Sequence, residues 1–237
     1  VKRDNRRALP KYLLTILLCG LLGGVLGFFT GVAGAAGVAE TVRQALDRAL
    51  EAATPWGIVI SAVILLGTGW YLYAAAKRRC DAWDGEDEDT MDAVEQQLGW
   101  ALLLTGLMIV LDFFFFAASI VYGRFLPDLV LFLASVVVLI VLQQKVVDLE
   151  RRLNPEKRGS VYDMKFQKTW MDSCDEAERA QIGQACYRAY MVGTKVCTFL
   201  WVALLILNFV FDFGMLPIAA VLVVWGVMQT VYALECI

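Results

Sequence analysis

The acidic side chain best placed for chemistry is Asp112, which stands in an apolar stretch between Leu111 and the run Phe113–Phe116. A bare carboxylate deep in a membrane would be costly, so such a residue is neutral, hydrated or paired. We expect Lys195, Asn208 or water to be its partner. Two roles remain open for Asp112: a structural hydrogen bond between neighbouring helices, and a proton or cation site.

Other catalytic chemistries lack their residues. The sequence contains no histidine, which excludes imidazole bases and histidine-ligated metals. An aspartyl membrane protease needs two facing aspartates at depth, and only Asp112 qualifies. The run Asp81–Gly85 resembles the start of the DxxDG metal site of lipid-head-group transferases, but the later positions lack its Ala-Arg pair and its further aspartates. We interpret the six cysteines, which show no CxxC spacing, as reduced packing residues. We therefore predict no enzyme, no metal site and no cofactor.

The composition is typical of a membrane protein. Of 237 residues, 59% are hydrophobic and 19% charged, against about 45–50% and about 25% in soluble domains. A spanning helix needs about 20 mostly apolar residues. Suitable windows lie at about residues 12–36, 56–76, 98–122, 127–147, 191–213 and 217–236. We therefore predict an all-α polytopic integral membrane protein, with about six transmembrane helices in a single membrane domain over residues 1–237. The first window is too long for a typical signal peptide, so we expect it to be retained.

The polar connections between these windows have distinct characters. Residues 40–51 alternate apolar and charged side chains at helical spacing, which indicates either a short amphipathic helix on the outer surface or a solvated helical linker. Pro55, Pro127 and Pro217 each stand where a span is expected to begin. Residues 80–97 form an acidic segment, which we interpret as a solvated loop. Residues 148–190 form the largest polar segment, which we expect to hold a loop and a helix that continues into the fifth span.

The distribution of lysine and arginine predicts the orientation. With six spans, 17 of the 21 Lys and Arg residues fall on one side, three on the other and Lys195 within a span. The positive-inside rule then puts both termini and residues 148–190 in the cytoplasm. The spans form three helical hairpins, which is a weak internal repeat or simply a consequence of proline near each outer turn. Asp128 and Asp212 lie close to the outer interface, so we expect both to be solvated.

Small residues mark one face of the first predicted helix. Gly20, Gly24, Gly27 and Gly31 recur at steps of three and four. Such a face lets another helix approach closely in lipid. We expect it to serve helix packing within the chain, with homodimerisation as the alternative.

The segment Lys168–Glu178, followed by Ala185, Tyr187 and Tyr190, carries a resemblance to a known family. It resembles the uncharacterised bacterial membrane-protein family catalogued as domain of unknown function 3169. The resemblance covers nearly the whole chain, including an acidic segment before the third span and a Phe-rich third span. It implies residence in a bacterial plasma membrane and occasional proximity to helix-turn-helix regulators, but no assigned activity.

The same segment has two physical interpretations. Ser173 followed by Glu176 forms a capping-box signal, with Asp175 and Glu178 in the first turn of the new helix. Alternatively, the segment is a cytoplasmic docking surface. Its candidate partner-binding residues are Trp170, Ser173, Asp175, Glu176, Glu178, Tyr187 and Tyr190.

Two functional hypotheses follow. The leading one is a non-enzymatic bacterial plasma-membrane protein that contacts a protein partner at the cytoplasmic face through residues 148–190. The alternative is a small transporter or channel with Asp112 as its proton or cation site. The net charge of -3 argues against direct nucleic-acid binding. The lipid bilayer is the expected environment, and a homo-oligomer is compatible with the sequence.

Overall fold

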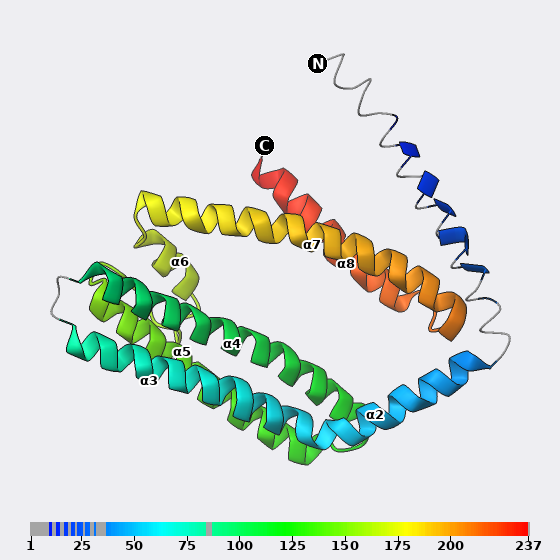
Figure 1. Cartoon of the computed structure of the whole chain (residues 1–237), viewed down its shortest axis with the longest axis horizontal. Helices are drawn as coiled ribbons and strands as arrows, with labels where there is room; N and C mark the ends of the chain where they lie inside the picture. Colours follow the sequence, from blue (N-terminus) through cyan, green and yellow to red (C-terminus); the bar gives the residue numbers. More distant parts are fainter. Residues whose placement is uncertain are drawn as a thin grey trace. The chain divides into compact units, whose positions relative to one another are not determined.

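The computed structural model describes residues 37–83 and 87–236, together with isolated positions between 10 and 31. Its elements are α2 (Val38–Ser61), the π-helical turn η1 (Ala62–Leu66), α3 (Gly67–Ala82), α4 (Glu88–Val121), α5 (Phe125–Leu153), α6 (Phe166–Asp172), α7 (Glu176–Phe211) and α8 (Leu216–Glu235) (Figure 1). No strand occurs among the described residues. The predicted all-helical class is confirmed.

Five helical segments are long and apolar enough to cross a membrane. They are Trp56–Ala82, Asp89–Val121, Phe125–Leu153, Glu176–Asn208 and Leu216–Glu235. Each contains most or all of one predicted window, whereas the window at residues 12–36 falls largely outside the described residues. The chain is therefore a multi-pass membrane protein.

The segment before the second span is helical, as predicted, but it is not separate from the span. The charged residues 40–51 and the start of the span belong to one helix, α2, which continues through Pro55. Proline in a helix interior removes one backbone hydrogen bond. Next to it, the hydroxyl of Thr54 donates to the carbonyl of Leu50 at 2.6 Å. Pro55 therefore lies within α2, directly before the candidate span that begins at Trp56. Pro127 and Pro217 lie in the first turns of α5 and α8.

The acidic segment 80–97 is mostly helical rather than a loop. α3 extends to Ala82, and α4 begins at Glu88. The carboxylate of Asp87 caps α4 by accepting a hydrogen bond from the Asp89 amide at 3.2 Å. Acidic residues stabilise the first turn of a helix because its N-terminus carries a partial positive charge. The charged residues thus lengthen α3 and α4 beyond their apolar windows.

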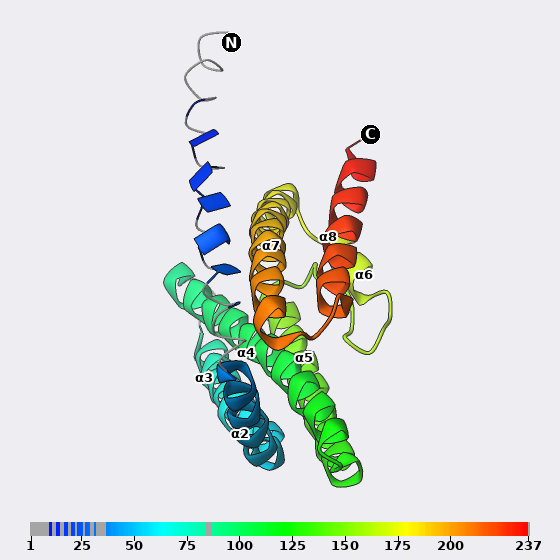
Figure 2. The same cartoon turned by 90° about the vertical axis from the view of Figure 1, so that its right-hand side faces the viewer.

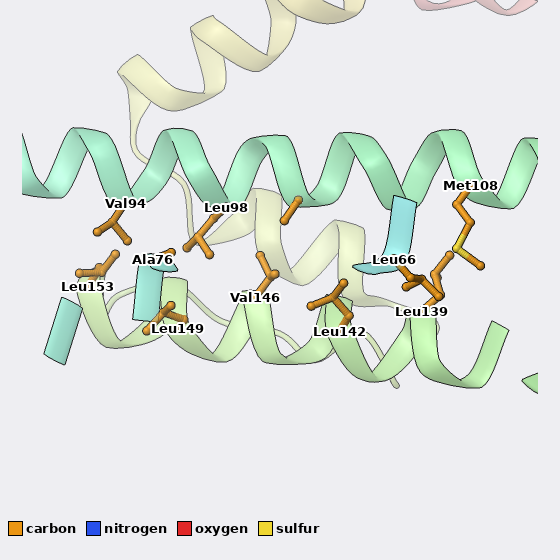
Figure 3. Packing of buried hydrophobic residues seen from close by; sticks show 11 residues of the cluster. Leu66, Ala76, Val94, Leu98, Met108, Leu139, Leu142, Val146, Leu149 and Leu153 are labelled. Carbon is orange, nitrogen blue, oxygen red and sulfur yellow. The ribbon is translucent and has the colours of Figure 1, made fainter. Parts of the chain in front are cut away.

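The chain divides into two compact units, which are described separately. Residues 47–180 form the first, here called the bundle unit. In it α3, α4 and α5 pack side by side (Figures 1 and 2). The labels in Figure 3 run in opposite directions on α4 and α5, from Val94 beside Leu153 to Met108 beside Leu139. The two helices are therefore antiparallel.

The bundle unit has a heptad seam. The buried positions of α4 recur at steps of four and three, and one step of seven ends the series: Val94, Leu98, Ala101, Thr105, Met108, Asp112 and Ser119. On α5 the same steps relate seven buried residues: Asp128, Ser135, Leu139, Leu142, Val146, Leu149 and Leu153. This is the pattern of helices packed knobs-into-holes. Gln144 and Val147 of α5 are also buried, outside this series. Within these two series the polar residues lie toward the turn that joins α4 to α5, apart from Thr105, and the remaining residues are apolar.

The π-turn keeps α2 and α3 in register with this seam. The step between the buried residues Ser61 and Leu66 is five, one more than the heptad allows, and the following step to Gly69 is again three. A π-helical turn contains one extra residue per turn. In η1 the amide of Gly67 accordingly bonds back to the carbonyl of Ala62. Because the π-helical turn accommodates the one extra residue, the buried positions before and after it face the same seam.

The second unit contains most of α7 and all of α8. The rings of Tyr190 and Tyr232 stack at 4.5 Å, and the Tyr190 hydroxyl donates to Gln229 Oε1 at 2.7 Å. A Cβ on Gly193 would lie 2.8 Å from Met228 Cε, so glycine permits this close approach. α7 continues without a break from the polar segment into the apolar one, which confirms the predicted continuous helix.

Candidate functional site

Asp112 is the centre of a polar layer across three helices. Its side chain is 0% exposed. Ser61 Oγ of α2 donates to Asp112 Oδ1 at 2.8 Å, and Ser135 Oγ of α5 donates to Oδ2 at 2.5 Å. These two serines supply the hydrogen bonds to Asp112 within the bundle unit, and Lys195 and Asn208 belong to the second unit. Lys195 is exposed, and the Asn208 side-chain oxygen accepts from the Gly214 amide at 2.9 Å.

Each serine has a choice of acceptor. Ser61 Oγ also lies 2.9 Å from the carbonyl of Ile58, and Ser135 Oγ lies 2.8 Å from the carbonyl of Phe132. A hydroxyl has one proton, so each serine donates either to Asp112 or to its own helix. With Asp112 ionised, both serines donate to the carboxylate. With Asp112 protonated, its O–H donates to one serine, which then donates to its own carbonyl.

The donor set suits a proton better than a metal ion. The layer offers one carboxylate and two hydroxyl groups. Calcium needs six to eight oxygen ligands, and zinc prefers nitrogen or sulfur. Among the described residues, no group of three or more His, Cys, Asp or Glu side chains could hold a metal ion. A proton requires only that one hydrogen bond reverse its direction.

The heptad spacing places a second polar layer seven residues further along each helix, at Thr54, Ser119 and Asp128. All three are buried, and Asp128 is only 1% exposed. The expectation that Asp128 is solvated is wrong, because the first turn of α5 packs its seam against the end of α4. Ser119 donates to the carbonyl of Phe116 at 2.8 Å, and Thr54 likewise donates within its own helix. Asp212, by contrast, is exposed.

One carboxylate oxygen of Asp128 lacks a hydrogen-bond donor. Oδ2 is buried without a hydrogen-bond partner. The Nε atom of Arg124 lies 3.8 Å away, which is an ion pair but too long for a hydrogen bond. The side chain of Arg124 is itself half exposed. Asp128 therefore connects the buried seam to the surface at the α4–α5 turn.

Aromatic rings separate the two carboxylates. A Cβ on Gly57 would overlap the ring of Phe115, so this position of α2 requires glycine. The rings of Phe116 and Phe132 stack at 4.8 Å between α4 and α5. Ser135 and Ser119 donate to the backbone carbonyls of these residues, as described above. The Phe-rich run of α4 thus forms the packing between the Asp112 and Asp128 layers.

On the other side of Asp112 the seam is closed by apolar side chains. Leu66, Met108 and Leu139 are buried next to it, and the same cluster continues along the bundle (Figure 3). The polar exception is Thr105, whose hydroxyl accepts from Gln143 Nε2 at 3.2 Å. The site at Asp112 is therefore closer to a polar route on the α4–α5 turn side than on the opposite side.

The helix start in the polar segment is two residues later than predicted. α7 begins at Glu176, and its capping box pairs Asp175 with Glu178. The Glu178 amide donates to Asp175 Oδ1 at 2.8 Å, and the Asp175 amide donates to Glu178 Oε2 at 2.9 Å. The prediction of Ser173 as N-cap is wrong, since Ser173 instead ends α6. Its hydroxyl donates to the carbonyl of Trp170 at 2.7 Å and accepts from the Arg158 amide.

Lys157 joins the loop to the start of α7. It is 4% exposed, donates to Glu178, and lies 3.6 Å from Cys174 Sγ. Its ammonium group also lies 5.9 Å from the centre of the Trp170 ring, within cation–π range. Burial lowers the pKa of Lys157, but the hydrogen bond and charge of Glu178 and the neighbouring Cys174 outweigh burial, so the pKa is raised overall.

Most candidate docking residues are used in internal contacts. Trp170 packs on Phe166 at 5.6 Å, and Tyr190 stacks on Tyr232. Of the predicted set, Glu176 and Tyr187 remain exposed without such a contact, with Tyr187 at 55%.

The glycine face of the first helix lies in the sparsely described region. A Cβ on Gly20, Gly24 or Gly31 would meet no described atom within 4 Å. Their role in helix packing, with that of Gly27, remains a prediction.

Comparison with known proteins gives one match. The family model described as "Protein of unknown function (DUF3169)" matches residues 6–235, nearly the whole chain. No curated protein and no solved structure matches. The resemblance drawn from the segment around Trp170 is thereby confirmed.

Proposed function

The chain belongs to the DUF3169 family of proteins of unknown function, and we propose from its geometry that it is a non-enzymatic, proton-coupled membrane protein. In this proposal Asp112 binds and releases a proton within the bundle unit, and the binding is coupled to transport across a bacterial plasma membrane. Lipid surrounds the apolar helices.

The observation that carries the proposal is that each of the two serines bonded to Asp112 has two possible acceptors, the Asp112 carboxylate and a backbone carbonyl of its own helix. A buried polar group without a partner is costly, and more so when it is charged. At Asp112 both the ionised and the protonated carboxyl can be fully hydrogen-bonded, because Ser61 and Ser135 each have a carbonyl within reach as an alternative acceptor. A purely structural carboxylate would need only one of these arrangements.

We further propose six spans, with both termini and residues 148–190 in the cytoplasm. The charged ends of α3 and α5 meet in the ion pair Asp81–Arg152 at 3.0 Å, which supports a single polar end for the bundle unit. The positive-inside rule assigns this end to the cytoplasm. Single cysteines at Arg43, Arg124 and Arg158, in a cysteine-free background, test this orientation with a membrane-impermeant maleimide on intact cells. Labelling only at position 158 would show that the orientation is the reverse of the one proposed.

The experiment for the function is a flux measurement in proteoliposomes. Wild-type vesicles that enclose a pH-sensitive dye receive an acid jump and, separately, a screen of solutes under a proton gradient. Asp112→Asn should abolish proton-dependent flux. Thr105→Val is the matched control, because Thr105 is equally buried in α4 but donates to its own helix and lies on the side of Asp112 away from Asp128. Flux in Asp112→Asn equal to wild type, or wild-type flux no higher than that of protein-free vesicles, would refute the proposal.

A second candidate function is docking of a protein partner through residues 148–190. The observation that favours it is a set of exposed apolar side chains outside the spans, with Tyr162 at 66% and Met164 fully exposed. Photo-crosslinking probes at Met164 and at the exposed control Gln167 test it in cells. A discrete protein adduct at Met164 that is absent at Gln167 supports docking. Recovery of no adduct at Met164 refutes docking at this position.

A further inference from the structure

We infer that Asp128 is the residue through which Asp112 exchanges its proton with solvent, at the end of the bundle unit where α4 turns into α5. This inference rests on the proposed proton site at Asp112 and adds the route by which the proton enters it. Three features carry the inference: register, the orphan oxygen of Asp128, and the aromatic packing between the layers.

The register aligns the two carboxylates along one seam. Each member of the Thr54, Ser119 and Asp128 layer lies seven residues from a member of the Asp112 layer. In an α-helix seven residues rise about 10.5 Å. The ring of Phe115 contacts α2 at Gly57, and both residues stand between the two layers in sequence. This contact agrees with the alignment of α2 and α4.

Asp128 has the features of an exchange residue. Its Oδ2 atom is buried and accepts no hydrogen bond, so it can accept a proton or a water molecule without breaking an existing bond. Other charged groups at this end are Arg124, Asp47 and Glu51. Arg124 lies within ion-pair distance of Asp128. Asp47 and Glu51 of α2 are the acidic groups that act electrostatically on Tyr122 at this turn.

The route requires water between the layers. About 10 Å is too far for a proton to pass directly between two carboxyl groups. The proton is therefore transferred from solvent to Asp128 Oδ2 and from there, carried by water, to Asp112, while Asp128 returns to its ionised form. Phe115, packed on Gly57, excludes water from this interval. Movement of that ring controls the rate of exchange.

Isotope exchange at the Asp112 carboxyl tests the inference. Wild-type protein in lipid vesicles is held at a pH where the protonated carboxyl gives an infrared C=O band that Asp112→Asn lacks. After transfer from H₂O to D₂O, the shift of this band reports exchange at Asp112. We expect Asp128→Asn to slow the shift about tenfold or more. The control Thr105→Val, at a buried position of α4 on the side of Asp112 away from Asp128, should leave it within about twofold. Phe115→Ala should accelerate it.

Each outcome has a separate meaning. A band that persists in Asp128→Asn shows that the variant folds and still protonates Asp112. If it exchanges at the wild-type rate, Asp128 is not the route, although the proton site stands. If wild type has no band assignable to Asp112 at any pH, the proton site itself is refuted, and this inference with it.

Discussion

The hydrogen bond between Asp112 and Ser135 should make a measurable energetic contribution between α4 and α5. The perturbation is a double-mutant cycle of Asp112→Asn, Ser135→Ala and the combined variant. Both side chains are buried, and their oxygens lie 2.5 Å apart. Removing either one alone leaves the other without this partner, whereas removing both does not. The cycle therefore isolates the interaction from the effect of each substitution alone.

The magnitude follows from the environment of the pair. Hydrogen bonds between membrane helices contribute about 0.6 kcal/mol on average and about 1.7 kcal/mol at most. Hydrogen bonds to charged groups contribute about 1.5–3 kcal/mol. Because Ser135 has the carbonyl of Phe132 as an alternative acceptor, part of this energy is recovered in the variants. We expect a coupling energy of about 1–2 kcal/mol, a factor of roughly 5–30 in the unfolding equilibrium.

The assay is reversible unfolding in mixed micelles as denaturing detergent is added, followed by helical circular dichroism. The control cycle pairs Asp112 with Ser119, which lies on the same helix one heptad away and bonds the carbonyl of Phe116. Its coupling should stay within about 0.5 kcal/mol, as for separated sites. Equal coupling energies in the two cycles would refute the role of Ser135 in holding Asp112.

Three further predictions concern the bundle unit. Gly57→Ala should destabilise the protein by about 1–3 kcal/mol, because the added Cβ overlaps the Phe115 ring. The control Gly67→Ala, whose Cβ meets open space, should be neutral or stabilising. Detergent unfolding of both variants measures the difference, and equal destabilisation would contradict the prediction. Asp175→Ala should lower the free energy of unfolding by about 1 kcal/mol through loss of the α7 cap, and Glu176→Gln should lower it by no more than about 0.5 kcal/mol. The reverse order would support Ser173 and Glu176 as the capping pair instead. Since the pKa of Lys157 is raised, its contribution to stability should be complete below its unfolded pKa of about 10.4 and lost as the pH rises through the folded value; unfolding from pH 8 to 12 should show this loss in wild type but not in Lys157→Met.

The parts of the fold that depend on local composition could be predicted from the sequence. Hydropathy alone locates the five described spans, and the continuous helix from Glu176 into the fifth window follows from helical spacing. The position of the α7 cap could not be decided locally, because Ser173 and Asp175 are both good N-caps. The choice depends on Ser173 ending α6 and bonding the Arg158 amide, which are contacts with residues distant in sequence.

The composition of the site depends on register, which hydropathy does not resolve. Ser61 and Ser135 are small hydroxyl side chains in apolar windows, and nothing in the hydropathy of these windows distinguishes them from inert serines. One signal was available: Asp112 and Ser135 are equally distant from the turn at Gly123 and Arg124, so an antiparallel pair places them opposite each other. The same symmetry pairs Ser119 with Asp128, whose burial contradicts its position near the end of a span. The extra residue in η1 hides the register of α3, because it breaks the heptad in the sequence.

The account depends on whether Asp112 takes up a proton inside the bundle, and infrared difference spectroscopy on the protein in lipid vesicles measures this directly. A pH titration of wild type should reveal a C=O band of a protonated, hydrogen-bonded carboxyl that appears reversibly as the pH falls, persists in Ser119→Ala and is absent in Asp112→Asn. A band that is unchanged in Asp112→Asn, or a carboxylate at Asp112 that stays ionised until the protein unfolds, would contradict the account.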